Sequence, residues 1–238
     1  MTKTFLSANW ENLVMANYAI SPGWLTPYLP AGVELDLYQE KSYVSLVGFM
    51  FKQTSLFNIG IPILGTFEEI NLRFYVKRVE GNTIKRGVVF INETVPYKMV
   101  AWLANKLYKE HYMAIPTKNS IVHSEFAQNI KYEWKINKHW NQIAVNMAKE
   151  SEPMLPGSIE EFIFEHYYGY TKINNNVSQE YKVSHPRWQV NKVIDYSIEC
   201  DFKTMYGNDF SFLGTQTPHS VIVAKGSRVT VKWKRTQF

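Results

Sequence analysis

The sequence predicts a mainly β protein with a few helices, folded as one domain. The chain has 238 residues, and β-barrels and β-sandwiches of about this length often form a single unit. Several segments alternate apolar and polar residues with the period-two spacing of half-buried strands, and aromatic residues make up 15% of the sequence. No repeat, low-complexity linker or change of composition divides the chain, so residues 1–238 are expected to form a single domain.

The first half of the chain predicts strands around one short helix. An opening strand is expected over residues 10–20, followed by a short helix with Ser21 as N-cap and Pro22 in its first position. Residues 33–37 and 43–51 predict two further strands, and residues 58–62 and 64–65 predict a loop. Residues 67–92 then predict a hairpin, because two strand-like runs flank a Glu-Gly-Asn turn at residues 80–82.

Two longer helices are expected after this hairpin. Thr94 is the expected N-cap of the first, whose apolar residues recur every three or four positions up to Leu107. Ser158 and Glu161 form a capping box at the start of the second, which is expected to run toward Tyr168 with Gly169 as its C-cap. Residues 130–136, 193–200 and 220–233 predict strands, the first with one face in solvent.

Charge, cysteine content and hydropathy limit the cellular compartments and the classes of partner that are expected. The net charge is +5 and the pI about 9.0, but the basic residues lie among acidic ones, and the cluster at residues 232–235 favours a solvated tail over a nucleic-acid contact. Cys200 is the sole cysteine, which fits a reducing compartment. The first ten residues lack a signal peptide, and the longest apolar run, residues 43–51, is too short for a membrane helix. A cytoplasmic protein that binds neither nucleic acid nor membrane is expected.

The strongest functional candidate is the run from Glu69 to Tyr75. Residues two apart in a strand share a face, so Glu69, Asn71, Arg73 and Tyr75 line one side and apolar residues line the other. Composition alone favours a polar face in solvent. The alternative is a closed barrel in which this face looks into a cavity, where Arg73 can hold a carboxylate and Glu69 can move a proton.

Other candidate groups give weaker signals. His185 and Trp188 lie in a His-Pro-Arg-Trp cluster, although a single histidine is more often structural, and residues 165–167 are read mainly as a solvated helix face. The six histidines show no metal-ligand spacing, and no nucleotide-binding glycine motif or GxSxG motif is present. No metal and no cofactor are therefore expected. Lys98, Lys106 and Lys109 are expected at the surface of their helix.

Five stretches in order resemble the uncharacterised YqjF-like family, a domain of unknown function in the acetoacetate decarboxylase-like superfamily. They are residues 29–36, 67–76, 165–171, 185–188 and 220–231, and the Glu-x-Asn-x-Arg-x-Tyr-Val run is the most specific. The resemblance implies a closed, cone-like antiparallel β-barrel with a central cavity and a few flanking helices. It also favours the cavity over solvent for the polar face that contains Glu69 and Arg73.

The sequence departs from these relatives in ways that bear on chemistry. The family commonly has arginine where this chain has His166, and a second proline where this chain has Arg187. The decarboxylases use a Schiff-base lysine followed by another lysine, and the resemblance places Tyr112 and Met113 in those positions. Tyrosine cannot form an imine with a ketone. Schiff-base decarboxylation is therefore not expected, unless Lys98 or Lys109 reaches the cavity.

The leading hypothesis is a barrel cavity that binds a small, carboxylate-bearing organic molecule. Glu69 is the candidate acid/base, and the candidate ligand-binding residues are Asn71, Arg73, Tyr75, Glu165, His185 and Trp188. One alternative is a lyase or hydratase that acts on a keto or hydroxy acid without the Schiff-base lysine. Another is a non-catalytic interaction or sensor protein that forms homo-oligomers through its aromatic strands. Whether the protein is an enzyme stays open at this point.

Overall fold

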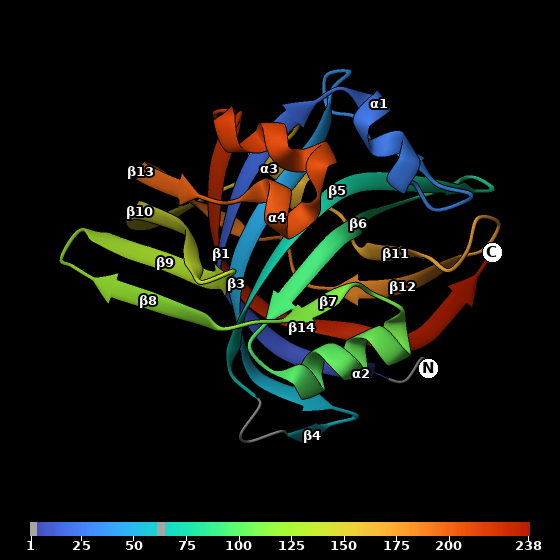
Figure 1. Cartoon of the computed structure of the whole chain (residues 1–238), viewed down its shortest axis with the longest axis horizontal. Helices are drawn as coiled ribbons and strands as arrows, with labels where there is room; N and C mark the ends of the chain where they lie inside the picture. Colours follow the sequence, from blue (N-terminus) through green and yellow to red (C-terminus); the bar gives the residue numbers. More distant parts are fainter. Residues whose placement is uncertain (1–3, 61–64) are drawn as a thin grey trace.

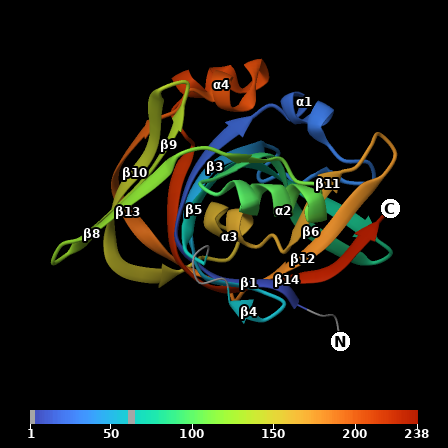
Figure 2. The same ribbon diagram turned by 60° about the horizontal axis from the view of Figure 1, so that its bottom comes forward.

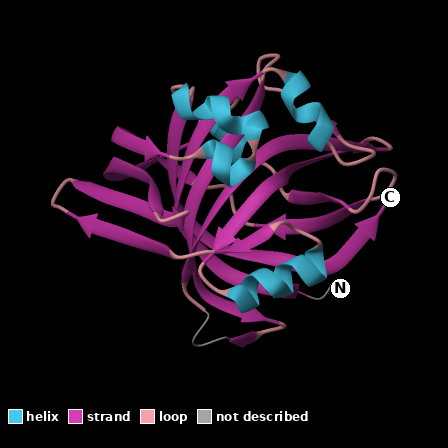
Figure 3. Cartoon of the chain, in the orientation of Figure 1, coloured by secondary structure: helices cyan, strands magenta, loops and turns pink. Residues whose placement is uncertain are grey.

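The computed structural model of the chain describes residues 4–60 and 65–238 and is dominated by strands (Figures 1 and 3). Part of the loop expected over residues 58–62 and 64–65 lies outside the described residues. The strands are β1 (Thr4–Ile20), β2 (Glu34–Leu35), β3 (Ser42–Leu56), β4 (Ile59–Gly60), β5 (Phe67–Glu80), β6 (Thr83–Val95), β7 (Tyr112–Ala114), β8 (Thr117–His123), β9 (Ala127–Ile136), β10 (His139–Pro153), β11 (Tyr168–Lys172), β12 (Ser178–Ser184), β13 (Gln189–Glu199) and β14 (Ser220–Gln237). The helices are α1 (Pro22–Leu25), α2 (Lys98–Tyr108), α3 (Ile159–Phe164) and α4 (Phe202–Tyr206), with 3₁₀ turns η1 (Thr26–Tyr28) and η2 (Asn208–Thr215).

Backbone pairing closes part of the sheet into a ring. Its order is β1, β3, β5, β6, β11, β12 and β14, and β14 pairs again with β1. Most neighbours are antiparallel, but β11 runs parallel to β6, with Tyr168 opposite Gly87 and Gly169 opposite Val88. The other junctions of the ring are antiparallel, as expected. The crossover through α2 and α3, which lie between β6 and β11 in the sequence, permits parallel pairing because such strands cannot be joined by a tight hairpin.

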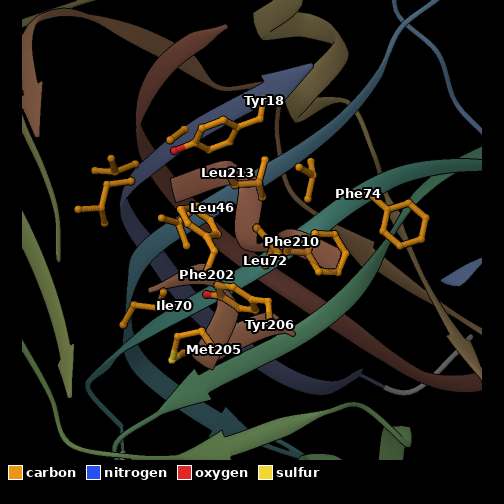
Figure 4. Packing of buried hydrophobic residues seen from close by; sticks show 14 of the residues in the cluster. Tyr18, Leu46, Ile70, Leu72, Phe74, Phe202, Met205, Tyr206, Phe210 and Leu213 are labelled. Carbon is orange, nitrogen blue, oxygen red and sulfur yellow. The ribbon is translucent and has the colours of Figure 1, made fainter. Parts of the chain in front are cut away.

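A second layer covers the outer face of the ring. From β14 the sheet continues through β13, β10, β9 and β8, and this part folds back over β1, β3 and β5 (Figure 1). Gly48 allows close packing between the layers, because a Cβ there would lie 2.6 Å from the Tyr132 ring. Figure 4 shows Ile70, Leu72 and Phe74 of β5 on this outer side, in the same apolar cluster as α4 and η2 residues.

A separate apolar core lies inside the ring. Helix α3 lies within it, and α2 lies across one side of the opening (Figure 2). Phe162 and Phe164 of α3 pack there with inward-facing residues of β3, β5 and β14. Strands β3 and β5 are thus buried on both faces, which fits their long runs of aromatic and β-branched residues.

Most of the expected elements are confirmed, with shifted ends. The hairpin over residues 67–92 is β5 and β6, and the Ser158 hydroxyl accepts a hydrogen bond from the Glu161 backbone N–H at the start of α3. The strand over residues 130–136 belongs to β9, where Tyr132 and Trp134 are fully buried and alternate with more exposed residues.

The helix boundaries and the last third of the chain differ from expectation. Thr94 lies in β6 opposite Met113 of β7, so α2 begins only at Lys98. Gly169 is not a helix C-cap but a residue of β11, because α3 ends at Phe164. Helix α4 was not expected, since its aromatic residues are equally typical of a buried strand.

Candidate functional site

The interior of the ring contains a cavity of about 320 Å³. Its walls come from ring strands, from β7 and from helices α2 and α3. The lining is mostly apolar and aromatic, and includes Phe49, Phe51, Phe67, Phe90, Phe164 and Trp188. An apolar cavity with a few converging polar groups is the usual form of a small-molecule site.

Glu69 is a buried carboxyl on the β5 wall of this cavity, with 3% of its surface exposed. Its Oε1 accepts a hydrogen bond from Asn71 Nδ2 at 2.9 Å, and its Oε2 accepts one from the Tyr112 hydroxyl at 2.8 Å. Burial raises the pKa of Glu69 to about 7, although these hydrogen bonds and the charge of Arg73 oppose the rise. A carboxyl with this pKa can both take and release a proton near neutral pH.

Arg73 lines the cavity two residues further along the same strand face. Its Nη2 lies 3.7 Å from the sulfur of Met15, its Cζ lies 5.9 Å from the Tyr75 ring centroid, and its Nε is buried without a hydrogen-bond partner. Within residues 4–60 and 65–238, no carboxylate forms an ion pair with this guanidinium. The buried Nε therefore carries the cost of an unmade hydrogen bond.

Two further carboxyls line the cavity, Glu93 on β6 and Glu110 just before β7. Oε1 of Glu110 accepts hydrogen bonds from Thr171 Oγ1 at 2.8 Å and from the Tyr181 hydroxyl at 2.9 Å. Burial raises the pKa of Glu110 to about 7. Burial, together with the charges of Glu110 and Glu69, raises the pKa of Glu93 well above its usual range, and Glu93 Oε2 has no hydrogen-bond partner. These carboxyls keep their protons at a pH where surface glutamates have lost them.

His166 reaches the cavity from the segment between α3 and β11. Its Nε2 lies 3.1 Å from Asp36 Oδ2, and the same oxygen accepts a hydrogen bond from Arg86 Nε at 2.6 Å. Burial lowers the pKa of His166 to about 4 despite the hydrogen bond with Asp36, so the imidazole is neutral at pH 7. The prediction of a solvated helix face at residues 165–167 is wrong for His166, which is 7% exposed.

Five of the residues predicted from sequence meet at the cavity: Glu69, Asn71, Arg73, His185 and Trp188. The rings of His185 and Trp188 stack with centroids 4.0 Å apart and planes inclined by 15°. Trp188 Nε1 donates a hydrogen bond to Ser227 Oγ at 2.8 Å, which fixes the indole.

Two of the predicted ligand contacts lie elsewhere. Tyr75 is buried behind the cavity wall, where its hydroxyl shares a 2.7 Å hydrogen bond with Ser45 Oγ. Glu165 follows the end of α3 and accepts a hydrogen bond from the Tyr167 hydroxyl at 2.9 Å. Neither residue lines the cavity, so we do not propose direct ligand contact for either.

Tyr112, which the family resemblance places where the decarboxylases have their lysine, is a hydrogen-bond donor in this cavity. Tyr112 lines the cavity, and burial raises the pKa of its hydroxyl well above the usual range, so it stays protonated beside Glu69. Lys98 and Lys109 are exposed at the two ends of α2. No lysine whose side chain the structure describes lines the cavity.

The sequence did not predict that Glu93, Glu110 and His166 line the cavity. It also did not predict that the Tyr112 hydroxyl donates a hydrogen bond to Glu69. A register irregularity between β5 and β6 displaces Glu93 from the alternation that places Val88 and Phe90 inward. Glu110 and Tyr181 come from separate elements and show no local spacing. The Glu-x-Asn-x-Arg alternation at residues 69–73 was the one local sequence pattern that pointed to cavity residues.

Among the described residues, no three His, Cys, Asp or Glu side chains are arranged to hold a metal ion. The described helices are also too short or too polar to cross a lipid bilayer.

The fold is like that of acetoacetate decarboxylase-like proteins, and the mainly β, cone-like architecture expected from the sequence is confirmed. Residues 7–228 match the family model DUF2071, described as an uncharacterised conserved protein (COG2071), and the chain belongs to that family. No curated protein matches the chain.

Three solved structures illustrate the likeness in fold. An acetoacetate decarboxylase-like enzyme from Sphingomonas wittichii RW1 has a TM-score of 0.65 at 10% identity, with 99% of this chain and 93% of that chain covered. The enduracididine biosynthesis enzyme MppR, complexed with pyruvate, has a TM-score of 0.65 at 11% identity over 100% and 91%. The acetoacetate decarboxylase of Legionella pneumophila subsp. pneumophila str. Philadelphia 1 has a TM-score of 0.60 at 10% identity over 96% and 84%. At these identities the likeness concerns the fold.

Proposed function

We propose that the cavity binds a small organic molecule that bears a carboxylate, with Arg73 as its anchor. The single observation that carries this proposal is the guanidinium of Arg73, which faces the cavity, has a buried and unpartnered Nε, and forms no ion pair with the described carboxylates. A carboxylate that accepts two N–H bonds from arginine forms one of the stronger polar contacts available in a protein. The apolar walls then enclose the rest of the ligand.

Asn71 and Glu69 stand beside this anchor on the same strand face. The Asn71 amide donates to Glu69, and its Oδ1 is buried without a partner, so it offers an acceptor to a ligand. Glu69 has a pKa of about 7 and therefore suits either proton donation or proton removal. This feature supports, as a second candidate function, a lyase or hydratase reaction on a keto or hydroxy acid in which Glu69 moves the proton.

Replacing Arg73 tests the anchor. We expect Arg73→Gln to weaken the binding of pyruvate, measured by isothermal titration calorimetry, by ten- to a hundredfold, because a hydrogen-bonded charge contributes about 1.5–3 kcal/mol. Pyruvate is the first probe because a protein with the same fold is complexed with it. Arg73→Lys keeps the charge without the two-pronged geometry and should fall between wild type and Arg73→Gln.

The matched control is Arg228→Gln, which removes an exposed arginine of β14 outside the cavity. This variant should bind pyruvate as the wild type does. Circular dichroism and thermal melting establish that both variants are folded. Unchanged pyruvate affinity in folded Arg73→Gln contradicts the anchoring role.

Borohydride trapping tests whether a lysine of this protein forms a Schiff base with pyruvate. We expect no covalent adduct after incubation with pyruvate and sodium borohydride, because no described lysine lines the cavity. Intact-protein mass spectrometry measures the result, with a lysine-dependent Schiff-base enzyme as positive control. A mass increase of one reduced pyruvate that peptide mapping places on a lysine contradicts this expectation.

A further inference from the structure

The cavity contains a second polar group that the proposed anchor does not use. His166 lines the cavity wall, its side chain is almost completely buried, and its Nδ1 has no hydrogen-bond partner. Buried imidazoles normally satisfy both ring nitrogens, so an unpartnered one inside a ligand cavity is a polar atom that lacks a contact.

Neighbouring side chains determine which ring nitrogen carries the proton. Asp36 Oδ2 lies 3.1 Å from His166 Nε2 and also accepts a hydrogen bond from Arg86. Burial opposes the charge of Asp36, but the hydrogen bonds from His166 and Arg86 prevail and lower its pKa, so it is an ionised carboxylate. An ionised carboxylate only accepts hydrogen bonds, so Nε2 of the imidazole carries the hydrogen. The lone pair is consequently on Nδ1.

Tyr75 holds His166 close to the proposed carboxylate anchor. The His166 ring centroid lies 4.9 Å from the Tyr75 ring centroid, and Arg73 Cζ lies 5.9 Å from the same point. Both groups also line the same cavity. The His166 ring and the Arg73 guanidinium therefore lie within about 11 Å of each other, so a small ligand whose carboxylate contacts Arg73 can direct a second polar group toward His166.

We infer that His166 Nδ1 accepts a hydrogen bond from a ligand hydroxyl, so that the preferred ligands are small hydroxy acids rather than the corresponding keto acids. This inference rests on the proposed function, because Arg73 supplies the carboxylate contact. A hydroxyl donates to Nδ1, whereas a ketone oxygen in the same place has no hydrogen to donate and leaves the acceptor unpaired.

The substitution His166→Gln tests whether Nδ1 of His166 accepts a hydrogen bond from the ligand. The glutamine amide nitrogen can replace Nε2 as donor to Asp36, while the amide oxygen does not occupy the position of Nδ1. Calorimetric titrations compare lactate with pyruvate and 3-hydroxybutyrate with acetoacetate. We expect His166→Gln to weaken binding of the two hydroxy acids by about five- to tenfold and to change the keto acids by less than about twofold. His123→Gln, on the exposed strand β8, is the matched control.

A second measurement needs no ligand. Nitrogen-15 spectra of the histidines at pH 7 should identify His166 as a neutral imidazole with its hydrogen on Nε2. A hydrogen on Nδ1, or equal loss of both ligand types in His166→Gln, overturns the inference while leaving the anchor intact. Affinities for all four acids unchanged by His166→Gln also overturn it. Failure of the wild-type protein to bind any of the four overturns the proposed function, and the hydroxy acid preference with it.

Discussion

The Gly87→Ala variant is expected to lose about 3 kcal/mol of unfolding free energy. A Cβ at residue 87 would lie 2.5 Å from the backbone oxygen of Tyr168 and 2.6 Å from Cε2 of Tyr170. The first of these atoms belongs to the backbone and cannot rotate away. Strands β6 and β11 must therefore separate where their pairing closes the ring, and this pairing involves only two residues on each strand.

Urea denaturation followed by tryptophan fluorescence measures the loss. The control is Gly23→Ala in α1, where the nearest atom to an added Cβ is Ser21 Oγ at 4.0 Å. Alanine is the better helix former, so the stability of this control should equal or slightly exceed that of the wild type. A denaturation midpoint of Gly87→Ala within error of the wild-type value contradicts the structure of this junction.

The three buried carboxyls are expected to lower the stability of the wild-type protein as pH rises from about 4.5 to above 7, against the opposite effect of His166, whose lowered pKa raises stability between about 4 and 6.5. At low pH the buried carboxyls of Glu69, Glu93 and Glu110 are protonated in both states and contribute no pH dependence. Between 4.5 and about 7 the unfolded chain releases these protons while the folded protein keeps them, because burial raises the folded-state pKa values of these carboxyls. The contribution of these carboxyls makes unfolding more favourable throughout that interval. Above the folded-state pKa values the loss is complete.

Glu110→Gln should remove one part of this dependence. Its amide oxygen can still accept from Thr171 and Tyr181, whereas the titrating proton is gone. A pKa raised from 4.5 to about 7 corresponds to roughly 3 kcal/mol, so the variant should exceed the wild type by about that amount at pH 8 and match it at pH 4.

Chemical denaturation at intervals between pH 4 and pH 8 gives the curve for each protein. The control is Glu152→Gln, which changes an exposed glutamate at the end of β10 and should follow the wild-type curve. Parallel curves for the wild type and Glu110→Gln would mean that Glu110 is ionised at little cost in the folded protein.

The sequence was most informative where structure depends on local pattern. Alternation from Glu69 to Tyr75 correctly divides β5 into a polar and an apolar face, and the Ser158–Glu161 spacing locates the start of α3. Both signals arise within a few residues of the chain. Local pattern does not show whether the polar face of β5 meets solvent or a cavity, because this depends on whether distant strands close a ring. Only the family resemblance favoured the cavity.

The errors have physical causes that a local pattern does not contain. Thr94 has the chemistry of an N-cap, but pairing with β7 holds it in a strand, and α2 starts at Lys98 without a side-chain cap. His166 follows a helix of six residues, so its direction is set by the chain that leaves α3 rather than by helical periodicity. Its partner Asp36 is 130 residues away in sequence.

Both faces of β5 are buried, but against different surroundings, and this has an evolutionary consequence. Ile70, Leu72 and Phe74 contribute to the apolar layer in Figure 4, whereas Glu69 and Arg73 contact the cavity. Under the proposed function, mutations at residues 70, 72 and 74 therefore act on folding, and mutations at residues 69, 71 and 73 act on the ligand. Selection for a new ligand can change one set while the other is preserved. Proteins that share this scaffold can in this way diverge in specificity by changes along a single strand.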